Sequence, residues 1–98
     1  MSSVNGLPPV HPGEFIKEIL GEIGLTQADF ARSIGVSAMR ISHVVNGRRP
    51  VTAELALLIG KAFGQTPQYW LNLQADYDIK IAEKAIGKKL SEVHKLAA

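Results

Sequence analysis

The chain has 98 residues, which is enough for one small domain but not for two separate hydrophobic cores. Hydrophobic residues make up 46% and charged residues 20%, a balance typical of a folded domain. No apolar run approaches the roughly 18–20 residues of a membrane-spanning helix. The absence of cysteine excludes disulfides, thiolate metal sites and thiol nucleophiles. Because the first ten residues also lack the layout of a secretion signal, we expect a cytoplasmic protein.

The net charge of +2 is unevenly distributed along the chain. No acidic residue lies between Asp29 and Glu54. Such a cationic segment attracts a polyanion by Coulomb interaction and by counterion release, although a solvated surface explains the charges equally well. This segment holds all four arginines: Arg32, Arg40, Arg48 and Arg49.

The chain begins with a lead-in, residues 1–10, that is rich in glycine, proline and polar residues and that we expect to be flexible. Pro12 and Gly13 then open a helix that ends at Gly24. Glu14, Glu18 and Glu22 fall on the outer face of this helix. Its predicted buried stripe recurs at helical spacing and consists of Phe15, Ile16, Ile19, Leu20 and Ile23.

Two short helices follow in close succession. Thr26 is a predicted N-cap with Asp29 as the reciprocal residue of a capping box, and Gly35 ends this helix. Ser37 caps the next helix, and the pair 46–47 (NG) stops it. Two helices joined by so short a turn form a helix-turn-helix. The inward residues are Phe30, Ala31 and Ile34 on the first helix, and Ile41, Val44 and part of Val45 on the second.

Two further helices complete the predicted domain. Thr52 caps the fourth helix, whose predicted stripe is Leu55, Leu58, Ile59 and Ala62. The pair 66–67 (TP) starts a fifth helix that we expect to reach about residue 86 before Gly87 breaks it. The fold is therefore predicted as an all-α, five-helix bundle. Residues 11–86 are expected to form the domain, and residues 87–98 a basic tail.

The second and third helices resemble a known type of DNA-binding unit. Residues 26–31 (TQADFA), 35–37 (GVS), 41–42 (IS) and 46–47 (NG) are similar to the phage-repressor or XRE type of helix-turn-helix, which has a lambda-repressor-like fold. The flanking segments resemble the HigA, or VapI-like, antitoxin family over about residues 7–84. These segments are 11–14 (HPGE), 47–53 (GRRPVTA) and 63–74 (FGQTPQYWLNLQ).

This resemblance implies an antitoxin of a type II toxin–antitoxin system. Such proteins bind a HigB-type toxin, an mRNA-cleaving ribonuclease, and repress the operon that encodes both. They usually act as homodimers on palindromic operators. Two alternatives stay open: a stand-alone repressor of the XRE family without a toxin partner, and a protein-interaction module that has lost DNA binding. The arginine cluster argues against the second alternative.

The third helix is the predicted reader of DNA, because the second helix of a helix-turn-helix enters the major groove. Arg40 can donate two hydrogen bonds to guanine or contact a phosphate, and Met39 can pack on a thymine methyl group or fill the core. Gln27, at the first turn of the preceding helix, can contact a phosphate or remain solvated. Arg48 and Arg49 should flank the groove. The other predicted contacts from this helix are Ser37, Ala38, Ser42, His43 and Asn46.

The long fifth helix is the predicted dimer interface, because its outer apolar residues need a cover. We expect Trp70 to be core and Leu71, Tyr77 and Ile81 to contact a second copy. The acidic face of the first helix is usually a solvated surface, but it is also a candidate surface for a basic toxin.

Enzyme functions have little support in the sequence. His11, His43 and His94 do not stand at metal-ligand spacing with a carboxylate. Ser37 and Ser42 have no base with an orienting partner nearby. A glycine-rich phosphate loop is also absent from the sequence. We therefore expect no catalytic site, no cofactor and no metal.

Overall fold

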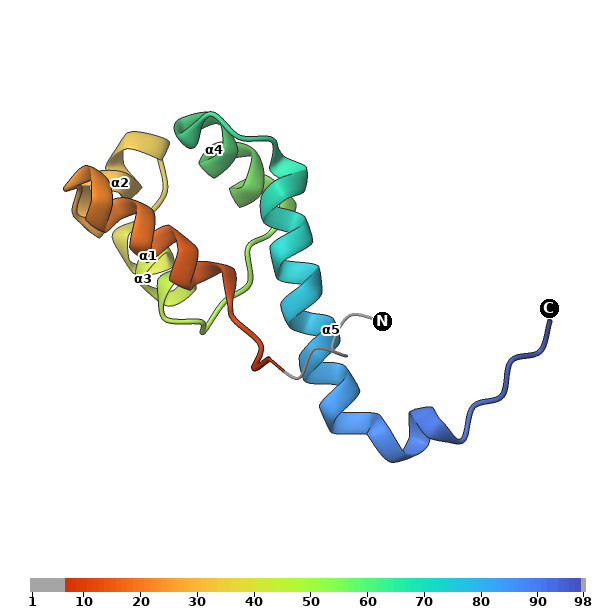
Figure 1. Ribbon diagram of the computed structural model, residues 1–98. Coiled ribbons are helices and arrows are strands. Elements are labelled where there is room, and N and C mark those ends of the chain that lie inside the picture. Colours follow the sequence, from red (N-terminus) through yellow and green to blue (C-terminus); the bar gives the residue numbers. More distant parts are fainter. Residues whose placement is uncertain (1–6, 98) are drawn as a thin grey trace.

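The structure is a computed structural model that describes residues 7–97. Residues 1–6 of the predicted lead-in lie outside the described residues. The described range contains no strand, which confirms the prediction of an all-α fold with five helices (Figure 1). These helices are α1 (Pro12–Ile23), α2 (Gln27–Ile34), α3 (Ala38–Val45), α4 (Ala53–Phe63) and α5 (Pro67–Ser91).

Each helix begins at a residue whose side chain accepts a hydrogen bond from a backbone amide of the first turn. Such N-caps satisfy amides that have no partner within the helix. For α1 the cap is His11, whose Nδ1 atom accepts a 2.9 Å hydrogen bond from the amide of Gly13. The sequence did not identify this cap. The four hydroxyl caps are those predicted: Thr26, Ser37, Thr52 and Thr66.

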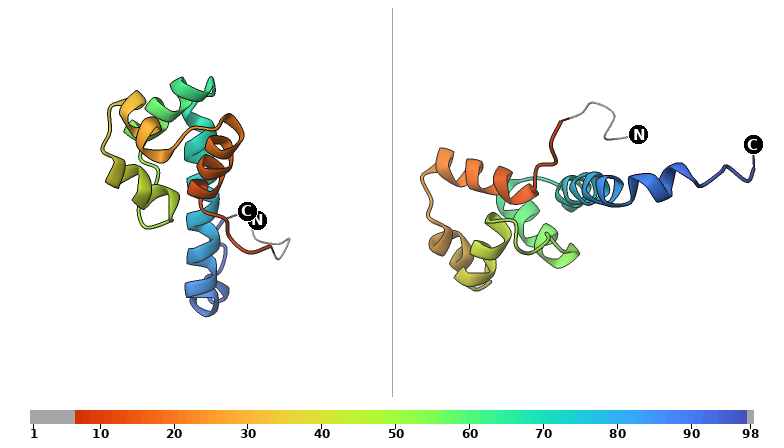
Figure 2. Two further views of the ribbon diagram at one scale, coloured as in Figure 1. Left: turned by 90° about the vertical axis from the view of Figure 1, so that its left-hand side faces the viewer. Right: turned by 90° about the horizontal axis from the view of Figure 1, so that it is seen from below.

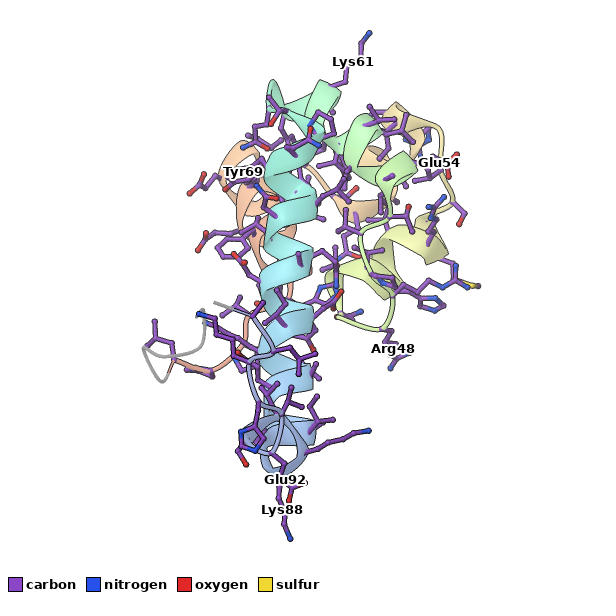
Figure 3. The ribbon with its side chains drawn as sticks, turned by 90° about the vertical axis from the view of Figure 1, so that its right-hand side faces the viewer. Arg48, Glu54, Lys61, Tyr69, Lys88 and Glu92 are labelled. Carbon is purple, nitrogen blue, oxygen red and sulfur yellow. The ribbon has the colours of Figure 1, made fainter. Side chains whose placement is uncertain are left out.

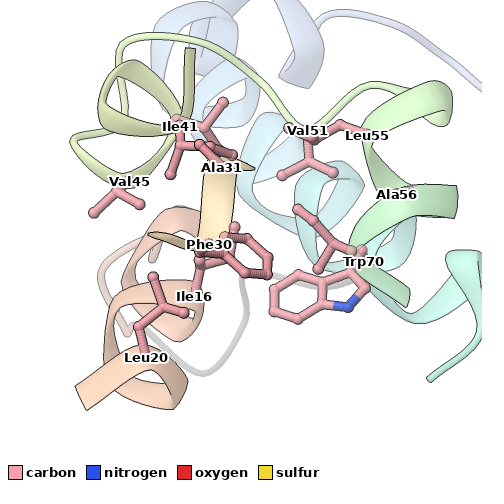
Figure 4. Close-up of a cluster of buried hydrophobic side chains, with 12 residues drawn as sticks. Ile16, Leu20, Phe30, Ala31, Ile41, Val45, Val51, Leu55, Ala56 and Trp70 are labelled. Carbon is pink, nitrogen blue, oxygen red and sulfur yellow. The ribbon is translucent and has the colours of Figure 1, made fainter. Parts of the chain in front are cut away.

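The core lies between α1–α4 and the first half of α5 (Figure 4). Trp70 is completely buried, as predicted, and its indole N–H donates a 2.7 Å hydrogen bond to Oε1 of Gln65. Phe63 stacks on Phe30 with ring centroids 5.0 Å apart. The buried apolar residues are Ile16, Leu20, Phe30, Ala31, Ile41, Val44, Val45, Val51, Leu55, Ala56, Ile59 and Trp70.

A few residues of the predicted stripes are not in the core. Ile23, the last residue of α1, is 59% exposed, although Leu20 one turn earlier is buried. Ala62 in the last turn of α4 is also exposed. Val51 and Ala56, which were not predicted, are buried instead. Amphipathic spacing identifies a face but not where along the helix the neighbours stop covering it.

The close packing of α1 on α3 depends on Gly13. A Cβ atom at this position would collide with the backbone carbonyl oxygen of Val44. The sequence suggests Gly13 only as part of a helix start, whereas its role in the structure is to let the two backbones approach.

The fifth helix extends well beyond the bundle (Figure 2) and gives the molecule extents of 49 × 23 × 21 Å. It bends at Ile86, whose φ of −116° and ψ of 22° are not helical, and then continues to Ser91. The prediction that the helix ends before Gly87 is therefore wrong, because the helix only bends at the neighbouring residue Ile86. Gly87 does not adopt a positive φ, unlike Gly24 and Gly64 at the ends of α1 and α4.

Candidate nucleic-acid interface

Helices α2 and α3 are joined by a turn of three residues, 35–37. Gly35 takes a left-handed conformation, with φ of 73°, which lets the chain reverse directly after α2. The amide of Val36 donates a 3.0 Å hydrogen bond to the carbonyl of Ala31, and Oγ of Ser37 accepts from the amide of Arg40 at 3.1 Å. The turn is therefore held at both ends, and it orients α3 relative to α2.

The outer side of α3 is exposed, as predicted. Ile41 and Val44 point into the core, and Val45 is also buried. Met39 is 67% exposed, which excludes the alternative that it fills the core. The remaining predicted contacts on this side range from half-buried to exposed: Ser37, Ala38, Ser42, His43 and Asn46. This surface is polar and sulfur-bearing and lacks an acidic residue of its own.

Arg40 lies at the flank of this surface and not at its centre. One terminal nitrogen of its guanidinium, Nη1, is 3.4 Å from Oε1 of Glu54, and the other, Nη2, donates a 3.2 Å hydrogen bond to Oγ1 of Thr52. Both partners belong to the start of α4. The sequence has no acidic residue between Asp29 and Glu54. Arg40 nevertheless has a carboxylate partner, because the fold places Glu54 beside it.

The basic connector, residues 47–50, wraps around the end of α3. Gly47 has a φ of 74°, and the amides of Arg48 and Arg49 both donate to the carbonyl of His43, at 2.7 and 3.2 Å. Both arginine side chains are exposed. Among the described residues, the salt bridges of the arginines involve Arg32 and Arg40 only. Helix α3 thus lies between the side chains of Arg48 and Glu54 (Figure 3).

The end of the connector is anchored to α5 by Gln74, which the sequence analysis missed. Oε1 of Gln74 accepts a 2.7 Å hydrogen bond from the buried amide of Val51, and Nε2 donates to Oδ1 of Asp78 at 3.0 Å. Gln74 is only 7% exposed. The signal was present in the sequence, because Gln74 stands four residues after Trp70 on the inward face of α5, where an apolar residue is expected.

A second anchor is His11, which the sequence suggests as part of segment 11–14 and excludes as a metal ligand, but not as a structural contact of the connector. Because Nδ1 accepts from Gly13, the remaining ring N–H is the donor in the hydrogen bond to the backbone of Arg49. Burial lowers the pKa of His11 below its ordinary value of 6.5, although the bond to Arg49 and the carboxylates of Asp78 and Glu14 act in the opposite direction. The neutral ring is therefore the form that fits this position.

The N-terminal end of α2 carries the other predicted phosphate contact. Gln27 is half-buried at the first position of α2. Asp29 forms a salt bridge of 2.8 Å with Arg32 one turn further on, and this bond, followed by one from Thr26, holds the pKa of Asp29 below its usual range. The amide of Asp29 donates to Oγ1 of Thr26 at 3.0 Å, which is the predicted cap.

The three residues predicted for dimerisation have different surroundings. Leu71 packs against the core, and Tyr77 packs edge-on against the ring of His11 with centroids 5.0 Å apart. Ile81 is 43% exposed on the part of α5 beyond the bundle. Two of the three side chains thus contribute to the fold of a single chain, and dimerisation through them stays a prediction.

None of the helices in the described chain combines the length and apolar character that crossing a bilayer requires. Over residues 7–97, no three histidine or acidic side chains are grouped closely enough to hold a metal ion.

Comparison with known proteins agrees with this geometry. Residues 16–70 match the model of a helix-turn-helix family. The virulence-associated protein I of Dichelobacter nodosus is 41% identical over 81 residues, which cover 82% of this chain and 75% of that protein. The structure of a HigA-family addiction-module antidote protein from Coxiella burnetii superposes with a TM-score of 0.88 at 42% identity, covering 91% of this chain and 99% of the other.

A further solved structure was determined with DNA. The Pseudomonas aeruginosa antitoxin HigA with the higBA promoter superposes with a TM-score of 0.85 at 35% identity, covering 91% of this chain and 99% of the other. The chain therefore belongs to the helix-turn-helix family of HigA and VapI-like antitoxins.

Proposed function

We propose that this protein is a HigA-type antitoxin that binds an operator through α3 and represses the operon encoding itself and a HigB-type toxin. The observation that carries the proposal is the exposed outer side of α3, next to a basic connector that is anchored to two other helices. Support comes from the related Pseudomonas aeruginosa antitoxin, whose structure includes its promoter. We place the protein in the cytoplasm, where an operator and a toxin's mRNA substrate are found.

The proposed DNA contacts fall into two groups. The outer side of α3 provides the groups that reach base edges, with Met39 and His43 at its centre and Arg40 at its flank. The other proposed contacts of this surface are Ser37, Ala38, Ser42 and Asn46. Gln27, Arg48 and Arg49 contact backbone phosphates. Such contacts carry no sequence information by themselves. The exposed guanidinium groups are well suited to this second task.

Two copies of the chain are proposed to act together. A helix-turn-helix dimer places its two reading helices one DNA turn apart, roughly 34–36 Å, on a palindromic site. The protruding part of α5, with Ile81 exposed, offers a surface for this association. Sedimentation velocity on the full chain tests the dimer directly: a single monomeric species at micromolar concentration contradicts it.

Binding to the DNA upstream of the protein's own gene tests the operator proposal. In a gel-shift titration, we expect the upstream duplex to bind more tightly than a scrambled duplex of equal length. The logarithm of affinity should fall with the logarithm of salt concentration by about −0.9 per neutralised phosphate. A flat salt response, or equal affinity for both duplexes, contradicts the proposal.

The toxin is tested separately. We expect the protein to co-purify with a small basic protein encoded next to it, and to relieve the growth arrest that this protein causes when produced alone. A stand-alone repressor would keep sequence-specific DNA binding and show neither effect. An interaction module without DNA binding would bind and neutralise its partner protein but show no sequence-specific DNA binding.

A further inference from the structure

We infer that Glu54 and Thr52 are specificity-determining positioning residues: they hold the Arg40 guanidinium at the edge of the reading surface and keep it away from DNA phosphates. This inference rests on the proposed DNA-binding function. It concerns how the protein distinguishes its operator from other DNA, which the geometry of α3 alone does not address.

The contacts fix the orientation of the Arg40 guanidinium. Nη1 contacts Oε1 of Glu54 at 3.4 Å while Nη2 donates to Oγ1 of Thr52 at 3.2 Å, so the two terminal nitrogens are held by the N-cap of α4 and by a residue of its first turn. The Arg40 side chain is 27% exposed, whereas the Glu54 side chain is 74% exposed. Arg40 is thus partly buried between α3 and α4, with its plane set by Thr52 and Glu54.

The hydroxyl group of Thr52 also has a structural role. The same Oγ1 atom accepts a 3.2 Å hydrogen bond from the amide of Leu55 and caps α4. A hydroxyl oxygen has two lone pairs, so it can accept from Leu55 and from Arg40 together. The start of α4 therefore provides a rigid support against which the Arg40 side chain rests.

The consequence for DNA binding follows from charge. An arginine on a flexible side chain adapts to any nearby phosphate and so raises affinity for all sequences alike. A guanidinium that is already oriented loses less conformational freedom when it meets a guanine edge in the correct place. Specificity depends on such a difference between competing complexes: Glu54 and Thr52 favour the contact of Arg40 with a guanine edge over its contacts with phosphates.

The test compares an operator duplex with a scrambled duplex of equal length by fluorescence anisotropy. For E54A we expect affinity for the scrambled duplex to rise about tenfold, with a salt slope steeper by about 0.9, because Arg40 becomes able to reach one more phosphate. Operator affinity should change by less than about threefold, so the ratio of the two affinities falls. The control E22A removes another exposed carboxylate, on α1, and should leave the ratio unchanged.

The double variant R40A/E54A separates positioning from simple charge repulsion. If Glu54 acts through Arg40, E54A has no effect on the scrambled duplex once Arg40 is absent. T52S retains the hydroxyl group and should retain the wild-type ratio. Thermal unfolding of each variant checks that the fold is intact.

Two results overturn the inference while leaving the proposed function standing. One is a ratio of operator affinity to scrambled-duplex affinity that is the same in E54A as in the wild type. The other is an equal gain in affinity on removing Glu54 with or without Arg40, which would make Glu54 a general repulsive charge. If the wild-type protein shows no preference for its operator, the proposed function and this inference fail together.

Discussion

The amide of Val51 donates a 2.7 Å hydrogen bond to the side chain of Gln74, and this bond ties the basic connector to the longest helix of the protein. Val51 is only 2% exposed, so no solvent is available to replace the bond. The position of Arg48 and Arg49 beside α3 thus depends on a residue more than twenty positions away in the sequence.

Replacing Gln74 should therefore affect both stability and DNA binding. For Q74M, which keeps the length of the side chain but not its polar atoms, we expect a loss of about 1–3 kcal/mol in the free energy of unfolding, because a buried amide loses its partner. Urea denaturation followed by circular dichroism measures this. N72A, at an exposed position of the same helix, serves as the control. Equal stability of Q74M and the wild type contradicts the role given to Gln74.

Two glycines of α1 offer a matched pair of substitutions to alanine. G13A should lower the free energy of unfolding by about 1–3 kcal/mol, because the new Cβ atom meets the Val44 carbonyl and forces α1 away from α3. G21A meets no atom within 4 Å and should instead stabilise the helix by about 0.5–1 kcal/mol. Thermal and urea unfolding give both values. Similar effects of the two substitutions would contradict the close approach at Gly13.

His11 makes the stability of the protein depend on pH. Its pKa is lowered in the folded state, so below about pH 6.5 the unfolded chain binds more protons than the folded one, and acidification favours unfolding. We expect the free energy of unfolding to fall between about pH 7 and about pH 5, before most carboxylates titrate. Protonation also removes the Nδ1 acceptor that caps α1.

The variant H11N isolates this effect. Asparagine is a good N-cap and does not titrate, so the fall in stability over this pH range should shrink. Urea denaturation of both proteins at each pH provides the comparison. If H11N and the wild type lose stability equally on acidification, the group responsible is not His11.

Arg48 and Arg49 should contribute to affinity without contributing to specificity. For R48A/R49A we expect a similar loss of affinity for operator and scrambled duplexes, and a salt slope reduced by about 1 for each arginine. K61A removes a charge in the last turn of α4, at the other end of the helical bundle from Arg48 (Figure 3), and should leave the slope unchanged. A loss confined to the operator would assign base reading to these two arginines instead.

Local signals in the sequence were sufficient for the number of helices, for the hydroxyl caps and for the reading surface, but not for the cap of α1 or the end of α5. The hydroxyl caps Thr26 and Ser37 and the turn at Gly35 are encoded within a few residues, so the helix-turn-helix could be placed from them. The spacing of Ile41 and Val44 correctly predicted which side of α3 is buried and therefore which side is exposed.

What the sequence could not provide were contacts between residues far apart in the chain. The pairing of Arg40 with Glu54 spans fourteen positions and that of Val51 with Gln74 twenty-three. The hydrogen bond from His11 to the backbone of Arg49 joins residues that are still further apart in the sequence. Such pairs depend on how helices pack, and no periodicity within one helix reveals them.

The most direct test of DNA reading by α3 is to alter the centre of its outer side and measure affinity for two duplexes. In M39A/H43A, neither substitution touches a fully buried residue, so thermal stability should be preserved. We expect operator affinity to fall by about tenfold or more, while affinity for a scrambled duplex stays within about twofold of the wild type. Undiminished operator affinity in this variant would contradict the assignment of α3 as the reading helix.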